Sequence, residues 1–341
     1  MAGPESRHEV GGPIAHGGNL SRARALFPHA PEPWIDLSTG ISPYSYPHSP
    51  IPGNAFARLP EPALAQELKS IAANAYGAPS ATHIAAGPGT QILLPIVAGL
   101  MGSGVNRAGV LSPTYAEHAR AARLSGLDVT ETEDLERLAA GRLAVIVNPN
   151  NPTGRVISKS DLLALAALMR AKGGLLVVDE AFMDVSDAES VADAVEEGGL
   201  VVLRSFGKFY GMAGLRLGFA MAHPDIVGKI EDRLGPWAVS GPALHIAGEA
   251  LADDGWQRAM RTTLKADAAR LDGLLAAAGV PVAGGTSLFR FIRDARVQTL
   301  FRHLGEGGIL ARRFEERPDD LRIGLPGRDD WARVEEALKT F

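Results

Sequence analysis

The chain has 341 residues, of which 46% are hydrophobic and 21% charged, with a formal net charge of −5 and no cysteine. This length is sufficient for one large domain with its own hydrophobic core and a smaller second domain. The acidic balance argues against nucleic acid or a membrane surface as the main partner, and the lack of cysteine excludes disulfide bonds and thiolate metal sites.

The N-terminal segment, residues 1–40, is rich in proline and glycine. We expect it to pack on the small domain and the active site rather than to form a domain of its own. Its beginning lacks the apolar core of a signal peptide. The longest apolar run of the chain, 92–102, contains a proline and is too short to span a bilayer. We therefore expect a cytoplasmic protein.

Short runs of β-forming residues alternate with helical stretches in the next part of the chain. Continuous apolar runs of this kind are typical of strands buried on both faces of a parallel sheet. The expected strands are 107–113, 142–149, 174–180, 199–205 and 215–222. Between them, 158–173 has Ser158 three residues before Asp161, as in a capping box, and ends at a glycine. The alternation predicts a large α/β domain, with a mostly parallel sheet flanked by helices, over residues 41–240.

The pattern changes in the last part of the chain. A long helical region ends at Gly279, and β-rich runs follow at 280–292, 307–314 and 321–326 before a final helical stretch at 329–341. This mixed order predicts a small C-terminal α+β domain over residues 241–341.

Polar residues stand where the expected strands of the large domain end. They are the segment 148–154 (NPNNPTG), Asp179, and the segment from Ser205 to Lys208. Open parallel sheets bind ligands outside the carboxyl ends of their strands, so these groups could converge. Earlier, Gly-Pro-Gly-Thr (87–90) precedes a helical stretch, which would place free backbone amides at a helix N-terminus, where anions bind.

An amine, a buried carboxylate, an amide side chain and an anion cradle together describe a pocket for pyridoxal 5′-phosphate. Lys208, in an apolar and cation-flanked position, would have a lowered pKa and form a Schiff base with the cofactor aldehyde. Asp179 would keep the pyridine nitrogen protonated, and Asn151 would donate to the phenolic oxygen. The other expected cofactor contacts are stacking by Tyr115 and phosphate binding by Ser205, Arg216 and the amides of Thr90 and Gln91.

Each of these residues alone has an ordinary structural interpretation. Asp179 could be a cap at the end of a strand, and NPNNPTG could be only a tight turn. Tyr115 could be a half-buried core residue, and Arg216 a surface charge. Their joint order along the chain is what favours the cofactor site.

In this order the residues resemble the fold-type I pyridoxal phosphate enzymes, the aspartate aminotransferase superfamily. Asn151-Pro-Thr-Gly, Asp179, Lys208 and Arg216 follow one another at the family's spacing, and RSFGKFYGMAGLRLGF (204–219) is similar to its Ser-x-x-Lys…Gly-x-Arg-x-Gly motif. The segment 321–327, LRIGLPG, resembles the one whose arginine binds the substrate α-carboxylate. The resemblance covers nearly the whole chain and implies a homodimer with sites completed from both subunits.

Within the superfamily the chain is similar to the histidinol-phosphate aminotransferase branch, and most of all to the cobalamin-biosynthetic L-threonine-O-3-phosphate decarboxylases. The segments that carry this likeness are AHGGNL (15–20), IDLSTGISPY (35–44), RLPEPAL (58–64), DEAFMD (179–184), PWAVSGPAL (236–244) and ARRFEERPDDLRIGLP (311–326). The resemblance implies conversion of L-threonine O-3-phosphate to (R)-1-amino-2-propanol O-2-phosphate and CO2. Transamination of histidinol phosphate or another amino acid is the alternative.

The same resemblance implies a set of substrate contacts. They are His16, Gly17, Gly40, Asn151, Arg312 and Arg322, with Arg313 as a further cation near Arg312. The residues alone leave His16 open, because a solvated N-terminal histidine fits the sequence equally well.

Three positions depart from the family pattern. Phe182 replaces a tyrosine that contacts the ring oxygen in aminotransferases, a change that the decarboxylases tolerate. Leu59 stands where many relatives have a tyrosine that reaches the partner subunit's phosphate. Gly40 stands where some decarboxylases have a substrate-binding asparagine, so only its backbone could take that role.

Two other classes of protein share parts of this pattern. Ser205-Phe-Gly-Lys208 fits the Ser-x-x-Lys motif of penicillin-binding enzymes, but the chain has no Lys-Thr-Gly element. A catalytically inactive pyridoxal fold that serves as a binding module would not need Lys208, Asp179 and Arg322 together, and its failure to take up cofactor would distinguish it.

Overall fold

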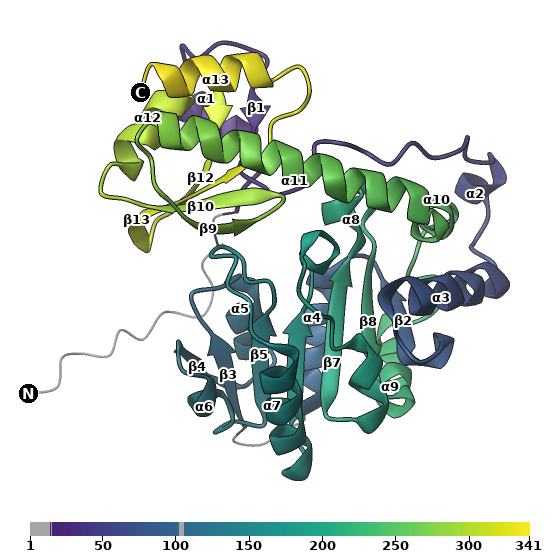
Figure 1. Ribbon diagram of the computed structural model, residues 1–341. Coiled ribbons are helices and arrows are strands. Elements are labelled where there is room, and N and C mark those ends of the chain that lie inside the picture. Colours follow the sequence, from purple (N-terminus) through teal and green to yellow (C-terminus); the bar gives the residue numbers. More distant parts are fainter. Residues whose placement is uncertain (1–13, 15, 102–105) are drawn as a thin grey trace, which may run out of the picture.

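The computed structural model describes residues 14, 16–101 and 106–341 (Figure 1). Residues 1–13 and 15 of the expected N-terminal segment lie outside the described residues. The largest sheet has seven strands in the order β2-β8-β7-β6-β5-β3-β4. Its strands are β2 (Ile84–Gly87), β3 (Arg107–Leu111), β4 (Asp128–Thr132), β5 (Leu143–Val147), β6 (Leu175–Asp179), β7 (Leu200–Ser205) and β8 (Gly218–Ala222).

Most of this sheet is parallel, as the sequence predicts. Strands β4, β3, β5, β6 and β7 pair in parallel. All residues of β5, β6 and β8 are buried, as continuous apolar runs require in a sheet covered on both faces.

The prediction of a parallel strand at 215–222 was wrong. Strand β8 begins only at Gly218 and runs antiparallel to both β7 and β2. Between β7 and β8 the chain forms only the four-residue helix α8 (Phe206–Phe209) and a 3-10 turn at Ala213–Leu215. A parallel return is usually made through a helix that packs back over the sheet, and this connection contains no helix of that length.

Helices cover the sheet and connect its strands (Figure 1). Helix α7 confirms the predicted capping box, because the Ser158 side chain accepts a hydrogen bond from the Asp161 amide. Helix α4 follows β2 directly, and α5 follows β3. Besides α8, the helices up to the smaller unit are α1 (Leu20–Leu26), α2 (Asn54–Ala57), α3 (Pro62–Tyr76), α4 (Thr90–Ala98), α5 (Glu117–Leu124), α6 (Leu135–Leu138), α7 (Lys159–Ala171), α9 (Pro224–Leu234) and α10 (Gly241–Ala252).

A second, smaller unit follows α10. Figure 1 shows the long helix α11 (Asp254–Ala277) running from beside α10 to an antiparallel sheet of order β12-β13-β10-β9. The strands of this sheet are β9 (Val282–Thr286), β10 (Phe289–Arg293), β12 (Arg312–Phe314) and β13 (Arg317–Gly324). The smaller unit also contains the helices α12 (Val297–Glu306) and α13 (Trp331–Lys339).

The N-terminal part of the described chain joins the smaller unit. Strand β1 (Ile35–Asp36) pairs in parallel with β11 (Ile309–Leu310), so the segment before residue 40 lies beside the C-terminal region. The domain boundaries at 40 and 240 stay predictions. In the described part of the chain, no helix is long and apolar enough to cross a membrane.

Candidate active site

Lys208 lies just beyond the carboxyl end of β7, in the short helix α8. Its backbone carbonyl accepts a hydrogen bond from the Ser42 amide, which fixes the turn. Burial, and then the nearby charge of Arg322, lower the pKa of the Lys208 amine to about 8, while Asp179 acts in the opposite direction. The lysine is therefore partly neutral near neutral pH, as a nucleophilic amine must be. Ser205 is the N-cap residue of α8.

Asp179 ends strand β6 and is 5% exposed. Its Oδ1 accepts a hydrogen bond from the Ala181 amide at 3.0 Å, and its Oδ2 lies 2.8 Å from Nε2 of His118. The imidazole of His118 is equally buried, at 4% exposure. His118 therefore fixes the orientation of the carboxylate, a role that the sequence reading missed although His118 stands only three residues after Tyr115.

An anion cradle forms where α4 begins. Gly89 precedes Thr90 with a φ of 88°, and a Cβ atom at position 89 would lie 2.7 Å from a terminal guanidinium nitrogen of Arg216. A Cβ atom at Gly218 would lie 2.5 Å from the Thr90 backbone nitrogen. The two glycines thus let the Arg216 guanidinium and strand β8 approach the N-terminus of α4 closely, where the first backbone amides, among them those of Thr90 and Gln91, begin the helix. This arrangement suits a phosphate group.

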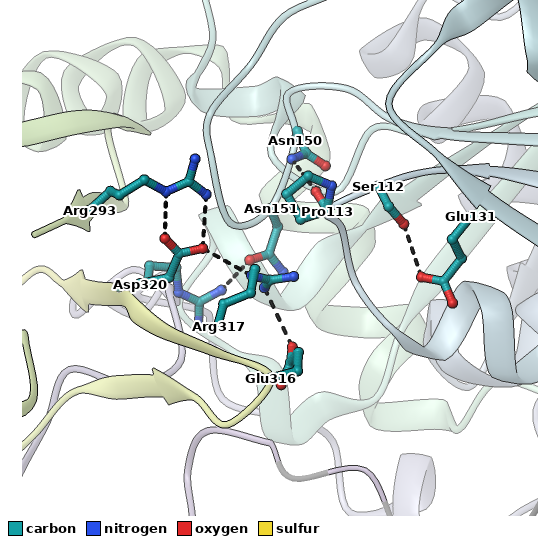
Figure 2. Close-up of polar contacts among 10 residues, drawn as sticks. Ser112, Pro113, Glu131, Asn150, Asn151, Arg293, Glu316, Arg317 and Asp320 are labelled. Atoms are coloured by element: carbon teal, nitrogen blue, oxygen red, sulfur yellow. Dashed lines mark hydrogen bonds and ion pairs between the residues drawn. The ribbon is translucent and has the colours of Figure 1, made fainter. Parts of the chain in front are cut away.

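The loop that contains Asn151 follows β5 of the large sheet and is hydrogen-bonded to the small sheet. Oδ1 of Asn151 accepts a hydrogen bond of 2.5 Å from Arg322 on β13. The preceding residue, Asn150, is buried and donates to the Pro113 carbonyl at 2.9 Å (Figure 2). Its Oδ1 also accepts a hydrogen bond from the Thr114 hydroxyl at 2.7 Å. Asn150 therefore ties the Asn151 loop to the residues just before Tyr115.

Arg322 is held in a buried position, at 6% exposure. Besides its bond to Asn151, it donates to the Ser38 carbonyl at 2.6 Å. Burial, and next the charge of Arg312, lower the pKa of the Arg322 guanidinium to about 10. Its Nε has no hydrogen-bond partner among the described residues. Gly40 lies beside it, because a Cβ atom there would be 3.6 Å from Arg322 Cζ.

Ion pairs support β13 next to this arginine (Figure 2). The carboxylate of Asp320, 1% exposed, accepts hydrogen bonds from Arg293 at 2.7 and 3.0 Å and from Arg317 at 2.9 Å. Arg317 also lies 3.6 Å from Glu316. Asp320 and Arg322 share one face of the strand. The pair of Asp320 with Arg293 joins β13 to β10 next to Arg322, whereas Arg317 braces Asp320 from within β13.

Tyr115 contacts two other residues of the predicted site, Gln91 and His16. Its hydroxyl donates to Oε1 of Gln91 at 3.0 Å, and its ring centroid lies 5.8 Å from that of His16. Burial is the largest cause that raises the pKa of Tyr115 to about 12, and the charges of Arg216 and Arg312 oppose this rise. The tyrosine is therefore within electrostatic reach of both the anion cradle and the small sheet.

The remaining predicted substrate residues border the same region. A Cβ atom at Gly17 would lie 2.3 Å from the Ser38 carbonyl oxygen, the oxygen that Arg322 contacts. Arg312 on β12 lies directly opposite Arg322 on β13 in the register of the two strands. Arg313, the next residue, places its guanidinium 5.0 Å from the Phe301 ring centroid on α12.

The positions that depart from the family pattern fall in two places. Phe182 is in the site, with its ring centroid 5.9 Å from Nζ of Lys208. Leu59 is on the surface and 64% exposed.

Glu117, a buried carboxylate that contacts His16, is a second residue that the sequence reading did not identify.

The amino-acid sequence is similar to those of known proteins. The family model for aminotransferase class I and II matches residues 49–341. The chain is 42% identical to a threonine-phosphate decarboxylase of Pseudomonas aeruginosa, covering 96% of this chain and 98% of the relative. It is 41% identical to a protein of the same name from a Sinorhizobium species, with the same coverage of 96% and 98%.

Solved structures share the fold. An L-threonine-O-3-phosphate decarboxylase from Porphyromonas gingivalis superposes with a TM-score of 0.72 at 23% identity, over 84% of this chain and 91% of the other. A histidinol-phosphate aminotransferase from Sinorhizobium meliloti, solved in complex with pyridoxal-5′-phosphate, gives a TM-score of 0.78 at 20% identity, over 94% and 93%. At these identities the likeness shows the fold alone.

Proposed function

The chain belongs to the aminotransferase class I and II family, and on this premise we propose that it is a pyridoxal phosphate-dependent threonine-phosphate decarboxylase. The observation that carries the proposal is its identity of 42% and 41%, over 96% of the chain, with two threonine-phosphate decarboxylases. The reaction would convert L-threonine O-3-phosphate to (R)-1-amino-2-propanol O-2-phosphate and CO2, a step of cobalamin biosynthesis.

The described residues fit the cofactor. Gly89 and Gly218 let Arg216 and strand β8 lie close to the N-terminus of α4, and a Cβ atom at either position would clash there. Lys208 offers an amine with a pKa of about 8, and Asp179 offers a buried carboxylate fixed by His118. An anion cradle, an amine and a carboxylate are what a phosphate, an aldehyde and a pyridine nitrogen require.

Bound pyridoxal phosphate supplies an electron sink for the pair released when a bond at the substrate Cα breaks. Asp179 would hold a proton on the ring nitrogen, with His118 behind it. Lys208 would carry the cofactor and later hold or deliver a proton at Nζ. Arg322, with its planar guanidinium, would bind the substrate carboxylate.

The choice of reaction depends on how the substrate is oriented. The bond that breaks is the one held perpendicular to the cofactor ring, and a decarboxylase must hold the Cα–carboxylate bond there. Cations that bind a phosphate at the far end of the substrate can turn it about Cα. His16 and Arg312 are the cations we assign to this role, with Arg313 as a further cation next to Arg312. The Gly17 backbone lies against Ser38, and the Gly40 backbone lies beside Arg322.

We also propose a cytoplasmic homodimer whose pocket lies at the subunit interface, with neither nucleic acid nor membrane as a partner. Leu59 has no hydroxyl and cannot supply the phosphate contact that a tyrosine makes from the partner subunit in many relatives. The exposed position of Leu59 is compatible with a purely apolar role at such an interface. A monomer that is fully active at nanomolar concentration would contradict the dimer.

A substrate comparison tests the proposal. The purified protein, loaded with pyridoxal phosphate, is incubated with threonine phosphate and, separately, with histidinol phosphate plus 2-oxoglutarate. We expect aminopropanol phosphate in the first reaction and no glutamate in the second. Glutamate formation with histidinol phosphate, and no product from threonine phosphate, would favour the aminotransferase instead and leave the cofactor site unaffected.

A further inference from the structure

Glu117 is a buried carboxylate at the edge of the site, and the proposed reaction assigns it no role. It is the first residue of α5, two positions after Tyr115, and its side chain is 6% exposed. Burying an unpaired carboxylate costs free energy of folding, so the groups that pair with Glu117 must be identified. Two of these groups, His16 and Gln91, belong to the predicted site.

Three donors surround the Glu117 carboxylate. Its Oε1 lies 2.9 Å from Nε2 of His16. Its Oε2 accepts from Nε2 of Gln91 at 2.8 Å and from Arg120 at 3.3 Å. The bond from Gln91 also turns the amide oxygen of that residue toward the Tyr115 hydroxyl. One carboxylate therefore orients both His16 and, through Gln91, Tyr115.

His16 depends on this contact for its position. The backbone beside it is anchored separately, because the Gly18 amide donates to Ser38 Oγ at 2.7 Å. The ring itself has one hydrogen bond to the part of the chain that the structure describes, namely that to Glu117, and its side chain is 43% exposed. Without Glu117, the backbone would stay in place but the ring could rotate into solvent.

The bond to Glu117 also decides which ring atom faces a ligand. Since Nε2 is engaged, Nδ1 remains for a second partner, and in the protonated ring both nitrogens donate. An anion suits Nδ1 of the protonated ring. The His16 ring centroid lies 5.8 Å from that of Tyr115, a residue that the charges of Arg216 and Arg312 reach. The carboxylates of Glu117 and Asp179 act on Tyr115 in the opposite direction, but Glu117 is already paired with three donors and Asp179 with His118.

We propose that Glu117 is a positioning residue for the substrate phosphate: it holds the His16 ring by Nε2, so that Nδ1 of the protonated ring can donate to a phosphate oxygen. This inference rests on the proposed function for the identity of the substrate. The placement of His16 by Glu117 does not depend on it. Glu117 acts through His16, so the two residues must be coupled energetically.

A double-mutant cycle tests the coupling in the holoenzyme. The variants are Glu117→Ala, His16→Ala and the double variant, and the measured quantities are KM and kcat for threonine phosphate and the dissociation constant of inorganic phosphate. Each single variant should raise KM and the phosphate dissociation constant roughly tenfold, the loss of one charge-assisted hydrogen bond, with little change in kcat. The double variant should be no worse than His16→Ala alone.

Additive effects, or an unchanged KM in Glu117→Ala, would overturn the proposal. Glu117→Gln keeps the size of the side chain and an oxygen that can accept from His16, so it should raise KM less than Glu117→Ala. It also covers the case in which the alanine variant does not fold. Glu131→Ala is the matched control, because Glu131 pairs with Arg123 on the surface and should leave both constants unchanged.

The phosphate measurement keeps the two proposals distinguishable. If threonine phosphate is not turned over, the proposed function fails. The coupling of Glu117 to His16 can still be measured from the inorganic phosphate dissociation constants. If turnover is present but the two residues do not couple, the proposed function stands and the positioning role is wrong.

Discussion

Arg322 on β13 donates a hydrogen bond of 2.5 Å to Oδ1 of Asn151, a residue 171 positions earlier in the chain. This bond joins the small antiparallel sheet to the loop that follows β5 of the large sheet. An arginine assigned to the substrate carboxylate and an asparagine assigned to the cofactor therefore lie side by side. We therefore expect the placement of the substrate relative to the cofactor to depend on this contact.

Arg322→Lys should raise KM for threonine phosphate at least tenfold, because a lysine cannot make a bidentate contact with a carboxylate or keep the bonds to both Asn151 and Ser38. Arg170→Lys is the matched control, since Arg170 on α7 pairs with Glu197 on the surface. Steady-state kinetics of both variants checks the prediction. Equal effects of the two substitutions would show that Arg322 has no special role.

Lys208→Ala should abolish turnover and leave the fold intact. The lysine lies in a four-residue helix beyond β7, and no neighbouring lysine occupies an equivalent place. Borohydride reduction of the native holoenzyme, followed by peptide mapping, should find the cofactor on Lys208. Finding the label on Lys159 or Lys172 would overturn the assignment of the site.

The rate at which the apoprotein takes up pyridoxal phosphate should rise with pH through a midpoint near 8. The pKa of the Lys208 amine is lowered from 10.5 to about 8, chiefly by burial and next by Arg322, and the neutral amine is the nucleophile. In Arg322→Gln the midpoint should move upward. A native midpoint near 10.5, measured by stopped-flow absorbance, would contradict the lowered pKa.

The same shift has a consequence for stability. Between about pH 8 and 10.5 the unfolded chain binds more protons at Lys208 than the folded apoprotein does. The contribution of this group to the free energy of unfolding therefore rises with pH across that window and is constant below it. Denaturant unfolding of the native apoprotein and of Lys208→Met across this range isolates the contribution, which should be absent in the variant.

Gly89→Ala should weaken cofactor binding roughly tenfold or more. The added Cβ would lie 2.7 Å from the Arg216 guanidinium, and the φ of 88° disfavours a side chain. Gly99→Ala is the control, because Gly99 ends the same helix with a φ of −66° and no atom lies within 4 Å of a Cβ there. Equal dissociation constants for pyridoxal phosphate in the two variants would contradict the cradle.

The sequence predicts those parts of the site that depend on strand ends. Asp179 and Lys208 each stand at or just after an apolar run, and the carboxyl ends of parallel strands meet at one edge of a sheet. Strand β4, which has no buried residue, lacks the apolar run that would reveal it. The antiparallel direction of β8 depends on the path of its connection, which a strand pattern does not encode.

The supporting contacts could not be predicted in the same way. His118 reaches Asp179 across 61 residues, and Glu117 reaches His16 across 101. Both lie in α5, where they look like ordinary polar residues of an amphipathic helix. Nothing in local spacing indicates which distant group a helical side chain contacts, so such partners become visible only once the chain is folded.

The product balance with threonine phosphate alone tests the account most directly. The holoenzyme is incubated with carboxyl-labelled L-threonine O-3-phosphate in the absence of any 2-oxo acid, and labelled CO2 and 1-amino-2-propanol O-2-phosphate are quantified together. We predict equal amounts of the two products over many turnovers, with both absent in Lys208→Ala. Loss of the amino group from threonine phosphate without release of labelled CO2 would contradict the decarboxylase and leave an aminotransferase.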